Sequence, residues 1–200
     1  MTIDKQVFME PVYLEQRLLI AMPKMSDPNF KHGVTLLCQH NDEGALGINI
    51  HQPSSMHVGE ILAQLNLPCD DEIVVNMPVL SGGPVQPERG FVLHNGRLHG
   101  REHDWDTSLR LHDDLMLSTS RDILVDIAAG RGPDRFLIAL GYSGWGAGQL
   151  EAELQENAWL NAQLDSELIF NSKPDERWRK ALDSIGVQHP DQISWVAGHA

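Results

Sequence analysis

Residues 135–154 read Arg-Phe-Leu-Ile-Ala-Leu-Gly-Tyr-Ser-Gly-Trp-Gly-Ala-Gly-Gln-Leu-Glu-Ala-Glu-Leu. The apolar run from Arg135 to Tyr142 predicts a strand. The glycine-rich stretch from Gly141 to Gly148 then leads into a helix, which carries on one face the apolar residues Leu150, Leu154 and Ala158. The order strand, glycine-rich turn, helix is the best-defined feature of the chain, and the other elements are placed around it.

Outward from this stretch, apolar runs predict further strands at 18–22, 34–38, 45–50, 73–75, 91–94, 97–99, 109–119 and 168–170. Helical spacing and terminal signals predict helices at 57–67, 121–129 and 174–186. The Asn95-Gly96 dipeptide favours a two-residue hairpin turn. Because helices do not alternate strictly with single strands, a doubly wound parallel sheet is disfavoured, and we expect one α+β domain with hairpins.

The composition is that of a folded globular protein. The chain has 200 residues, of which 42% are hydrophobic and 22% are charged. This length suits a single domain, and no repeat or linker divides it. We therefore expect one domain over 1–200, with a flexible polar tail at 1–11.

The charge balance excludes some classes of partner. Lys and Arg number 15 against 28 Asp and Glu, which gives a net charge of −13, and this charge repels nucleic-acid phosphates and anionic membrane surfaces. No secretory signal or run of 18 apolar residues is present. The two cysteines, Cys38 and Cys69, indicate neither a disulfide framework nor a zinc pattern. A cytoplasmic protein without nucleic-acid or membrane contacts is expected.

The stretch from Gly141 to Gly148 could be a phosphate-binding loop, because backbone N–H groups between a strand and a helix attract anions. However, no lysine follows Gly146 to neutralise a phosphate. Glu151 and Glu153 stand near the start of the helix, where they satisfy its dipole and repel a polyphosphate. A structural turn that shapes a surface patch is therefore expected.

Support for a nucleophile is weak. Ser143 lacks the glycine that a nucleophile elbow needs two residues later, because Trp145 stands there. Ser81 belongs to a Ser-Gly-Gly-Pro run that is first of all a chain reversal. Cys38 and His40 would share one face of a strand. Since Cys38 ends an apolar run, a buried and inert thiol is the expected outcome.

Ten histidines make a metal site worth testing. No His-Glu-x-x-His is present, and glycines argue that the richest region is hairpin and loop rather than helix. A solvated polar edge without a metal is expected there. The residues concerned are His94, His99, His103 and His112 with Asp104, Asp106 and Asp113.

The run Arg177-Trp178-Arg179-Lys180 is the only basic cluster. On a helix its members point in different directions, so Trp178 and Leu182 are expected to face the core. Arg177 and Lys180 are expected to extend toward solvent or to pair with acids. No helix-turn-helix, zinc finger or basic helix accompanies the cluster, and direct DNA binding is disfavoured.

Several motifs in one order resemble a bacterial family known as AlgH or YqgE. They are Leu18-Leu19-Ile20-Ala21-Met22-Pro23, Asp27-Pro28-Asn29-Phe30, Gly44-Ala45-Leu46-Gly47-Ile48-Asn49, Ser81-Gly82-Gly83-Pro84-Val85, Gly90-Phe91-Val92-Leu93-His94, Gly141-Tyr142-Ser143-Gly144-Trp145, Gly148-Gln149-Leu150-Glu151, Glu153-Leu154 and Asn157-Ala158-Trp159-Leu160. The resemblance implies a mixed, largely antiparallel bent sheet that forms a pseudo-barrel with helices around it, and an association with transcriptional regulation. The 187–200 segment departs from the pattern and is expected to be a peripheral extension.

Two classes of function follow from the motifs, and a third is disfavoured. The first is a non-enzymatic protein with an indirect regulatory role, which binds a protein partner or small ligand without a cofactor. Its predicted patch comprises Asp27, Phe30, Asn49, Gly82, Gly83, Tyr142, Trp145, Gln149 and Glu153. Aromatic rings beside amides and carboxylates would supply stacking and hydrogen bonds, although the same rings could fill the core. The alternatives are a hydrolase that uses His94 or Cys38 with a nearby acid, and a direct DNA-binding regulator.

Overall fold

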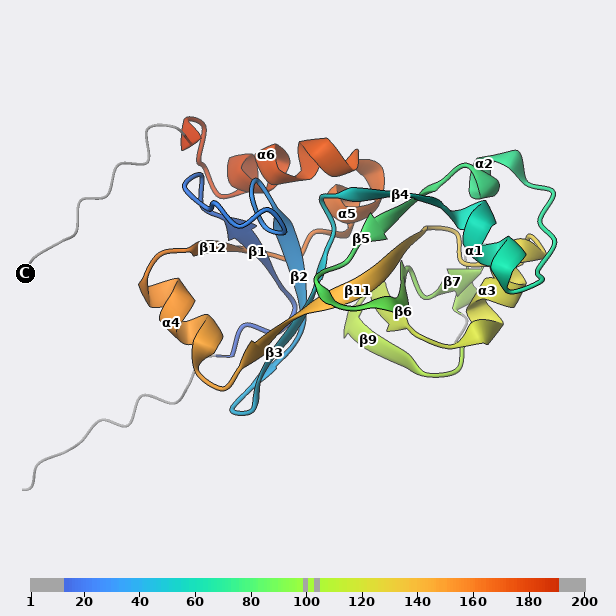
Figure 1. Ribbon diagram of the computed structural model, residues 1–200, viewed down its shortest axis with the longest axis horizontal. Coiled ribbons are helices and arrows are strands. Elements are labelled where there is room, and N and C mark those ends of the chain that lie inside the picture. The colour runs from blue at the N-terminus through green and yellow to red at the C-terminus, as the bar shows by residue number, and fades with distance from the viewer. Residues whose placement is uncertain (1–12, 99–100, 103–104, 191–200) are drawn as a thin grey trace, which may run out of the picture.

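One long strand, β11 (Phe136–Gly146), runs through both halves of the molecule (Figure 1). In this computed structural model, which describes residues 13–98, 101–102 and 105–190, the first part of β11 pairs with β6 (Val85–His94). The last part of β11 pairs with β3 (Gly44–Asn49), and both pairings are antiparallel. The strand therefore joins a β1 half, built on strands β12, β1, β2 and β3, to a β6 half, built on β6, β10, β9, β4 and β5.

The sheet has the strand order β12-β1-β2-β3-β11-β6-β10-β9. Neighbours along this path pair antiparallel, whereas β5 lies parallel to β11 and pairs with β4. A separate two-stranded ladder joins β7 (Arg97–Leu98) to β8 (Arg101–Glu102). The other strands are β1 (Arg17–Ala21), β2 (Val34–Asn41), β4 (Pro53–His57), β5 (Pro78–Ser81), β9 (Ser108–His112), β10 (Leu115–Ser118) and β12 (Trp159–Gln163).

Three glycines let the backbones cross where the two halves meet. A Cβ added at Gly82 would lie 2.3 Å from the carbonyl oxygen of Gly141, and one at Gly83 would lie 2.2 Å from the carbonyl carbon of Tyr142. Gly83 and Gly141 also have positive φ values of 149° and 75°. A side chain at any of these positions would push the strands apart, so these glycines permit close approach of one backbone to another.

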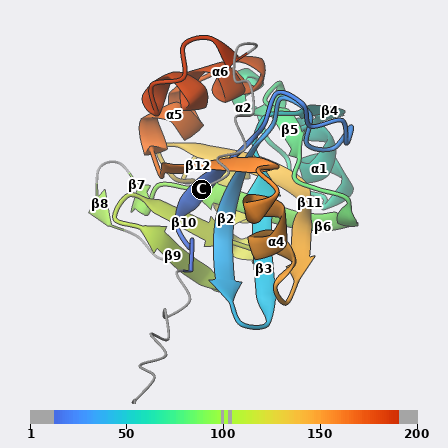
Figure 2. The same cartoon turned by 90° about the vertical axis from the view of Figure 1, so that its left-hand side faces the viewer.

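The helices cover the two halves separately. Near the β6 half lie α1 (Val58–Gln64), α2 (Glu72–Val75) and α3 (Arg121–Ala128) (Figure 1). Figure 2 shows α4 (Gln149–Gln155) in front of the hairpin formed by β2 and β3, with α5 (Ser166–Asn171) and α6 (Pro174–Ser184) above it. The fold class is confirmed: the described residues form an α+β fold, in which a largely antiparallel sheet curls into a half-barrel with six helices.

Apolar side chains fill three clusters. The first lies inside the curled sheet and beneath α5 and α6, and includes Leu36, Ile48 and Leu93. The second, with Ile123 and Ile138, lies between the sheet and the helices α1 and α3. The third surrounds two tryptophans beside α4. No described helix is long and apolar enough to span a membrane.

Two short apolar runs are helices rather than the predicted strands. The Asp71 carboxylate accepts hydrogen bonds from the N–H groups of the next turn, which makes 72–75 the one-turn helix α2. In the same way Asp165 caps α5, which contains 168–170. Runs of three apolar residues fit either structure, and in both cases the preceding aspartate decides.

Pairing between distant strands corrects three more predictions. Residues 91–94 pair with β10 and β11, so Asn95-Gly96 does not join them to 97–99 as a hairpin. The 109–119 run forms two strands, β9 and β10. The glycine-rich stretch continues β11 as far as Gly146, because β3 pairs with it there. The predictions for 1–11, His99, His103 and Asp104, and most of the 187–200 extension, lie outside the described residues.

Candidate functional site

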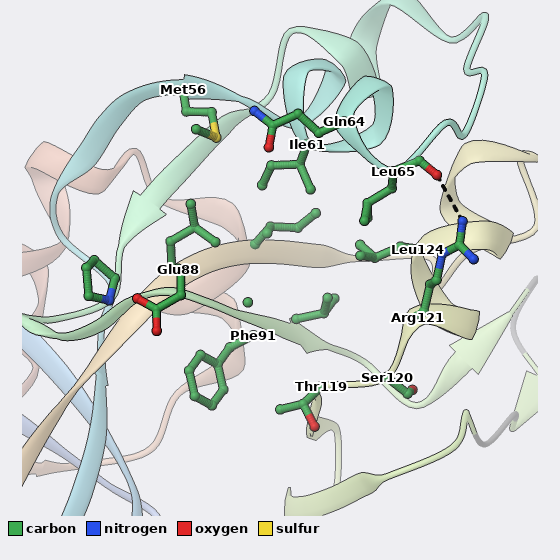
Figure 3. A pocket seen from close by; sticks show the side chains of 15 residues that line it. Met56, Ile61, Gln64, Leu65, Glu88, Phe91, Thr119, Ser120, Arg121 and Leu124 are labelled. Atoms are coloured by element: carbon green, nitrogen blue, oxygen red, sulfur yellow. Dashed lines mark hydrogen bonds between the residues drawn. The ribbon is translucent and has the colours of Figure 1, made fainter.

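Helices α1 and α3 stand apart over the sheet of the β6 half, and a pocket of about 490 Å³ lies between them (Figure 3). Strands β6 and β11 form its floor, and the two helices form its walls. The lining consists of Met56, Ile61, Gln64, Leu65, Pro87, Glu88, Gly90, Phe91, Val92, Thr119, Ser120, Arg121, Leu124, Ile138 and Leu140. Most of these side chains are apolar, and the polar ones come from helix ends and from one strand.

The helix faces explain which side chains reach the pocket. On α1, Val58 and Leu62 are buried in the cluster beneath the helix. Ile61 and Leu65 are four residues apart, so they share a neighbouring face that points into the pocket. Leu124 of α3 closes the opposite wall. Each helix therefore buries one row of apolar side chains against the sheet and turns part of a second row toward the pocket.

A glycine leaves the floor of the pocket open. Gly90 lies on β6, and a Cβ built there would have a single neighbour within 4 Å, the Cδ2 atom of Leu140 at 3.9 Å. Its φ lies outside the left-handed region, so the backbone would accept a side chain. The pocket therefore owes part of its volume to a missing side chain rather than to backbone strain.

Two charged residues stand at opposite ends of the pocket (Figure 3). The Arg121 guanidinium donates a hydrogen bond of 2.9 Å to the carbonyl oxygen of Leu65, which ties the start of α3 to the end of α1. The Glu88 carboxylate forms no hydrogen bond or ion pair with any residue of the described part of the chain. One end is thus already bridged, and the other end offers an unused acceptor.

The polar groups of this pocket are few, and one of them is already hydrogen-bonded within the protein. Ser120 uses its hydroxyl to donate to the carbonyl oxygen of Asp106 at 2.5 Å. Within the described ranges the lining contains no histidine or cysteine that could act as base or nucleophile. The arrangement can therefore hold an apolar body and orient one donor group at Glu88.

None of the nine residues predicted as a binding patch lines this pocket. Four of them gather around α4. The Glu153 carboxylate accepts hydrogen bonds from the indoles of Trp145 (2.9 Å) and Trp159 (2.7 Å), and from the Gln149 amide (2.9 Å). The Phe30 ring packs against both indoles. Trp145 is 6% exposed, so it is packed rather than displayed, and these polar groups use one another.

Four more of the predicted residues lie at the crossing of the two halves. Asn49 is buried, and its side-chain oxygen accepts from the hydroxyls of Thr35 (2.7 Å) and Ser143 (3.0 Å). The N–H of Asn49 donates to the carbonyl oxygen of Gly82 at 2.8 Å. Gly83 packs on the backbone of Tyr142, whose ring contacts Phe91. Within the described part of the chain, these residues form hydrogen bonds and packing contacts with other residues of the protein.

The ninth residue, Asp27, shapes a loop. Its carboxylate accepts from the backbone N–H (2.8 Å) and the side-chain amide (3.0 Å) of Asn29. The Asn29 carbonyl oxygen in turn accepts from the amide of Asn49 at 3.1 Å. The sequence motifs thus meet in one internal network, and their proposed role in binding stays a prediction.

The residues of the hydrolase hypothesis lie away from solvent. Burial raises the pKa of the Cys38 thiol from its ordinary value of 9.0 to about 12, as expected for an inert core thiol. His94 is fully buried, with its imidazole against the Ser118 hydroxyl (2.8 Å) and the Asn95 carbonyl oxygen (3.0 Å). A substrate in solvent reaches neither side chain. Among the described residues no group of three metal-ligating side chains converges.

Arg177 departs from its predicted exposure. It is 1% exposed, its guanidinium donates to the carbonyl oxygen of Ile50, and no acid pairs with it within the described residues. Burial lowers the pKa of Arg177 to about 10. The predicted placement of its neighbours is confirmed: Leu182 is buried, Trp178 donates to the carbonyl oxygen of Ala21 at 2.8 Å, and Lys180 pairs with Glu176.

The pocket itself was missed because its floor and walls come from four segments that are far apart in the sequence. Only two local signals pointed to it: Gly90 directly before the apolar run 91–94, and the second apolar face of α1 at Ile61 and Leu65. A glycine in a strand often marks the close approach of something else, but it does not say what approaches.

Comparison with known proteins assigns most of the chain to one family. Residues 18–190 match the family described as AlgH-like (DUF179). UPF0301 proteins of Xanthomonas oryzae pv. oryzae (strain PXO99A) and Xanthomonas campestris pv. campestris (strain B100) are each 48% identical over 190 residues, which cover 95% of this chain and 98% of each relative.

Two solved structures share the fold. The solution structure of the AlgH protein from Pseudomonas aeruginosa has a TM-score of 0.74 and 44% sequence identity, and the match covers 96% of this chain and 98% of that one. The crystal structure of a Corynebacterium diphtheriae protein has a TM-score of 0.69 at 18% identity, covering 93% of each chain, which shows the fold alone. The resemblance predicted from the motifs is confirmed, and the chain belongs to the AlgH-like family.

Proposed function

We propose that this protein binds an elongated apolar small molecule in the pocket between α1 and α3, with a cationic or hydrogen-bond-donating end of the ligand at Glu88. The observation that carries the proposal is a pocket of about 490 Å³ with an apolar lining and few polar groups. Ligand sites generally have volumes of about 300–1,000 Å³ and this same composition.

The charges at the pocket ends support a preferred orientation of the ligand. Arg121 already donates to Leu65, whereas Glu88 has no partner among the described residues. A ligand ammonium would form a charge-assisted hydrogen bond at Glu88, while a carboxylate there would meet a like charge. The net charge of −13 adds to this preference for cations.

The regulatory role that we propose is indirect. A ligand-binding protein of this charge would act through a partner, because contacts to nucleic-acid phosphates would be repulsive. This mechanism does not require the nine motif residues to form the ligand site, and it allows them to keep the internal contacts described above.

The test uses the neutral dye N-phenyl-1-naphthylamine, which fluoresces more strongly in apolar sites. We expect the dye to bind the full-length protein, and decylamine to displace it at a concentration at least about tenfold lower than decanoate does, a difference worth about 1.4 kcal/mol. Glu88→Gln should remove most of that preference while the dye still binds.

A filled-pocket variant and a matched control locate the binding. Gly90→Leu should abolish dye binding, because the new side chain occupies the floor. Gly144→Leu introduces the same side chain on β11 in the β1 half, where a Cβ would meet only Tyr142 at 3.6 Å, and should leave dye binding unchanged. Equal displacement by amine and acid, or dye binding that survives Gly90→Leu, would contradict the proposal.

A further inference from the structure

Helix α2 holds one isoleucine out in solvent. Ile73 is 79% exposed, whereas its neighbour Val74 packs into the cluster beneath α1. The Asp71 carboxylate accepts from the N–H groups of Ile73 (2.9 Å) and Val74 (3.3 Å), which fixes the turn. On the other side Gly59 lets α1 approach Val75 closely, since a Cβ at Gly59 would lie 2.6 Å from it. The exposure of Ile73 is therefore imposed by a well-anchored turn.

A groove of about 410 Å³ lies beside this isoleucine. It runs between α2, the connection that follows α3, the start of β11 and α5. Two aromatic rings contribute to its surface, and the Arg135 guanidinium lies 5.1 Å from the centre of one of them, Phe170. Its lining is Asp71, Ile73, Val74, Met77, Ile127, Gly130, Gly132, Pro133, Asp134, Arg135, Phe136 and Phe170.

The edge of the groove at α2 is negatively charged. Asp70, Asp71 and Glu72 are consecutive and exposed, and no cation of the described ranges pairs with any of them. The cations nearby are already neutralised. Arg135 pairs with Asp114 (2.6 Å) and with Glu167, and Arg131 pairs with Asp126 (3.1 Å). The exposed isoleucine is thus bordered by three carboxylates that form no ion pair within the described residues.

We propose that the α2 groove, comprising α2 and the lining residues above, docks a basic segment of a protein partner that inserts one apolar side chain against Ile73. Apolar contact would supply the burial, and Lys or Arg residues on either side would pair with the acidic edge. A second copy of this chain is a poorer occupant, because two molecules of net charge −13 repel each other. The groove shares no residue with the ligand pocket, so this inference stands apart from the proposed function.

The probe is a fluorescein-labelled peptide of sequence Lys-Arg-Lys-Leu-Lys-Arg-Gly, measured by fluorescence anisotropy with the full-length protein. We expect it to bind more weakly as salt rises, and we expect peptides with serine for leucine, or with acids for the basic residues, to bind at least about tenfold more weakly. Amide chemical shifts in a ¹H–¹⁵N spectrum should change at 70–77 and 130–136.

Variants separate docking in the groove from general attraction to an acidic protein. Ile73→Ser and the pair Asp70→Asn with Glu72→Gln should each weaken binding at least about tenfold. The pair Asp42→Asn with Glu43→Gln makes the same charge change at the exposed turn between β2 and β3, and should change binding less than about twofold. Asp71 is left intact because it caps α2.

Four outcomes would overturn the inference. They are absence of peptide binding, equal weakening by both double variants, shift changes outside the groove, and a dimer in sedimentation that Ile73→Ser dissociates. The last would assign the groove to a second copy of this chain. Because dye binding in the ligand pocket is read separately, failure here leaves the proposed function to its own test.

Discussion

The two halves of the molecule use their side chains in opposite ways. Around α4 in the β1 half, two indoles and an amide donate to the Glu153 carboxylate, and a phenyl ring packs against both indoles. Trp145 and Trp159 are 6% and 3% exposed. Between α1 and α3 in the β6 half, Gly90 leaves space and Glu88 is without a described partner. The half richest in family motifs is thus closed, and the half with fewer of them is open.

This difference suggests what the motifs are for. Aromatic and amide side chains that must fit one another restrict which residues can occupy each position, so a packed network produces a recognisable pattern. A pocket tolerates many apolar side chains of similar size, and so it leaves a weaker pattern. In this chain the nine residues of the predicted patch make contacts within the protein, and none of them lines the pocket that we propose as the ligand site.

Removing the Glu153 carboxylate should disrupt the aromatic cluster beside α4 and lower the free energy of unfolding most. Glu153→Ala leaves the two indole N–H groups, of Trp145 and Trp159, without their acceptor, and an unsatisfied buried donor costs about 1–3 kcal/mol. We expect the free energy of unfolding in urea to fall by about 2–4 kcal/mol.

The control for this experiment is Glu156→Ala, an exposed position that follows α4. It should change the free energy of unfolding by less than about 0.5 kcal/mol. Binding of the naphthylamine dye to Glu153→Ala should persist under native conditions, because the pocket lies in the other half. If both variants were equally stable, the carboxylate would not be the centre of the cluster.

Thiol reactivity tests how accessible each half is to solvent, because each half contains one cysteine. Cys38 is buried in the core, whereas Cys69 borders a hollow of about 500 Å³ beside α1. At pH 8 a disulfide reagent such as Ellman's reagent should modify one thiol of the native protein quickly. Cys69→Ser should abolish this fast phase, and Cys38→Val should leave it unchanged. Rapid reaction of Cys38 would show that the closed half opens.

The same thiol gives the stability a pH dependence. Burial raises the pKa of Cys38 to about 12, from 9.0, so the unfolded chain loses its proton first as pH rises. The contribution of this thiol to the free energy of unfolding is present below pH 9 and is lost as pH rises above it, by about 1.4 kcal/mol at pH 10. Cys38→Val should lack this fall. The comparison between the two proteins from pH 8 to 10 measures it, and equal slopes would contradict the burial of Cys38.

Sequence patterns correctly predicted the helices whose formation depends on neighbouring residues in the chain. The helices at α1, α3 and α6 follow from apolar spacing and from terminal residues such as Pro174 and Gly186. The apolar runs at 73–75 and 168–170 were misassigned, because three residues do not distinguish a strand from one helical turn. The caps at Asp71 and Asp165 were visible in the sequence and could have decided both cases.

Features that depend on distant segments could not be predicted in this way. The extension of β11 to Gly146 depends on β3, which lies about one hundred residues earlier in the chain. Whether Trp145 is packed or displayed depends on Phe30 and Trp159 closing over it. The pocket is a volume that four separate segments leave unfilled, and an unfilled volume has no residue pattern of its own.

Removing the hydrogen bond that joins α3 to α1 in the β6 half should change the free energy of unfolding least. Arg121→Met removes the hydrogen bond to the Leu65 carbonyl oxygen, which joins α3 to α1 across the pocket. Because Arg121 is exposed, water replaces the lost donor, and the free energy of unfolding should fall by only about 0.5–1 kcal/mol. Arg110→Met is the control, since its hydrogen bond to Asp113 stays within one hairpin. Dye affinity should fall more for Arg121→Met than for Arg110→Met, because only the first variant frees the pocket walls to move apart. If the two variants bound the dye equally well, the walls would be held by the packing of α1 and α3 on the sheet, and the bridge would contribute nothing to the shape of the pocket.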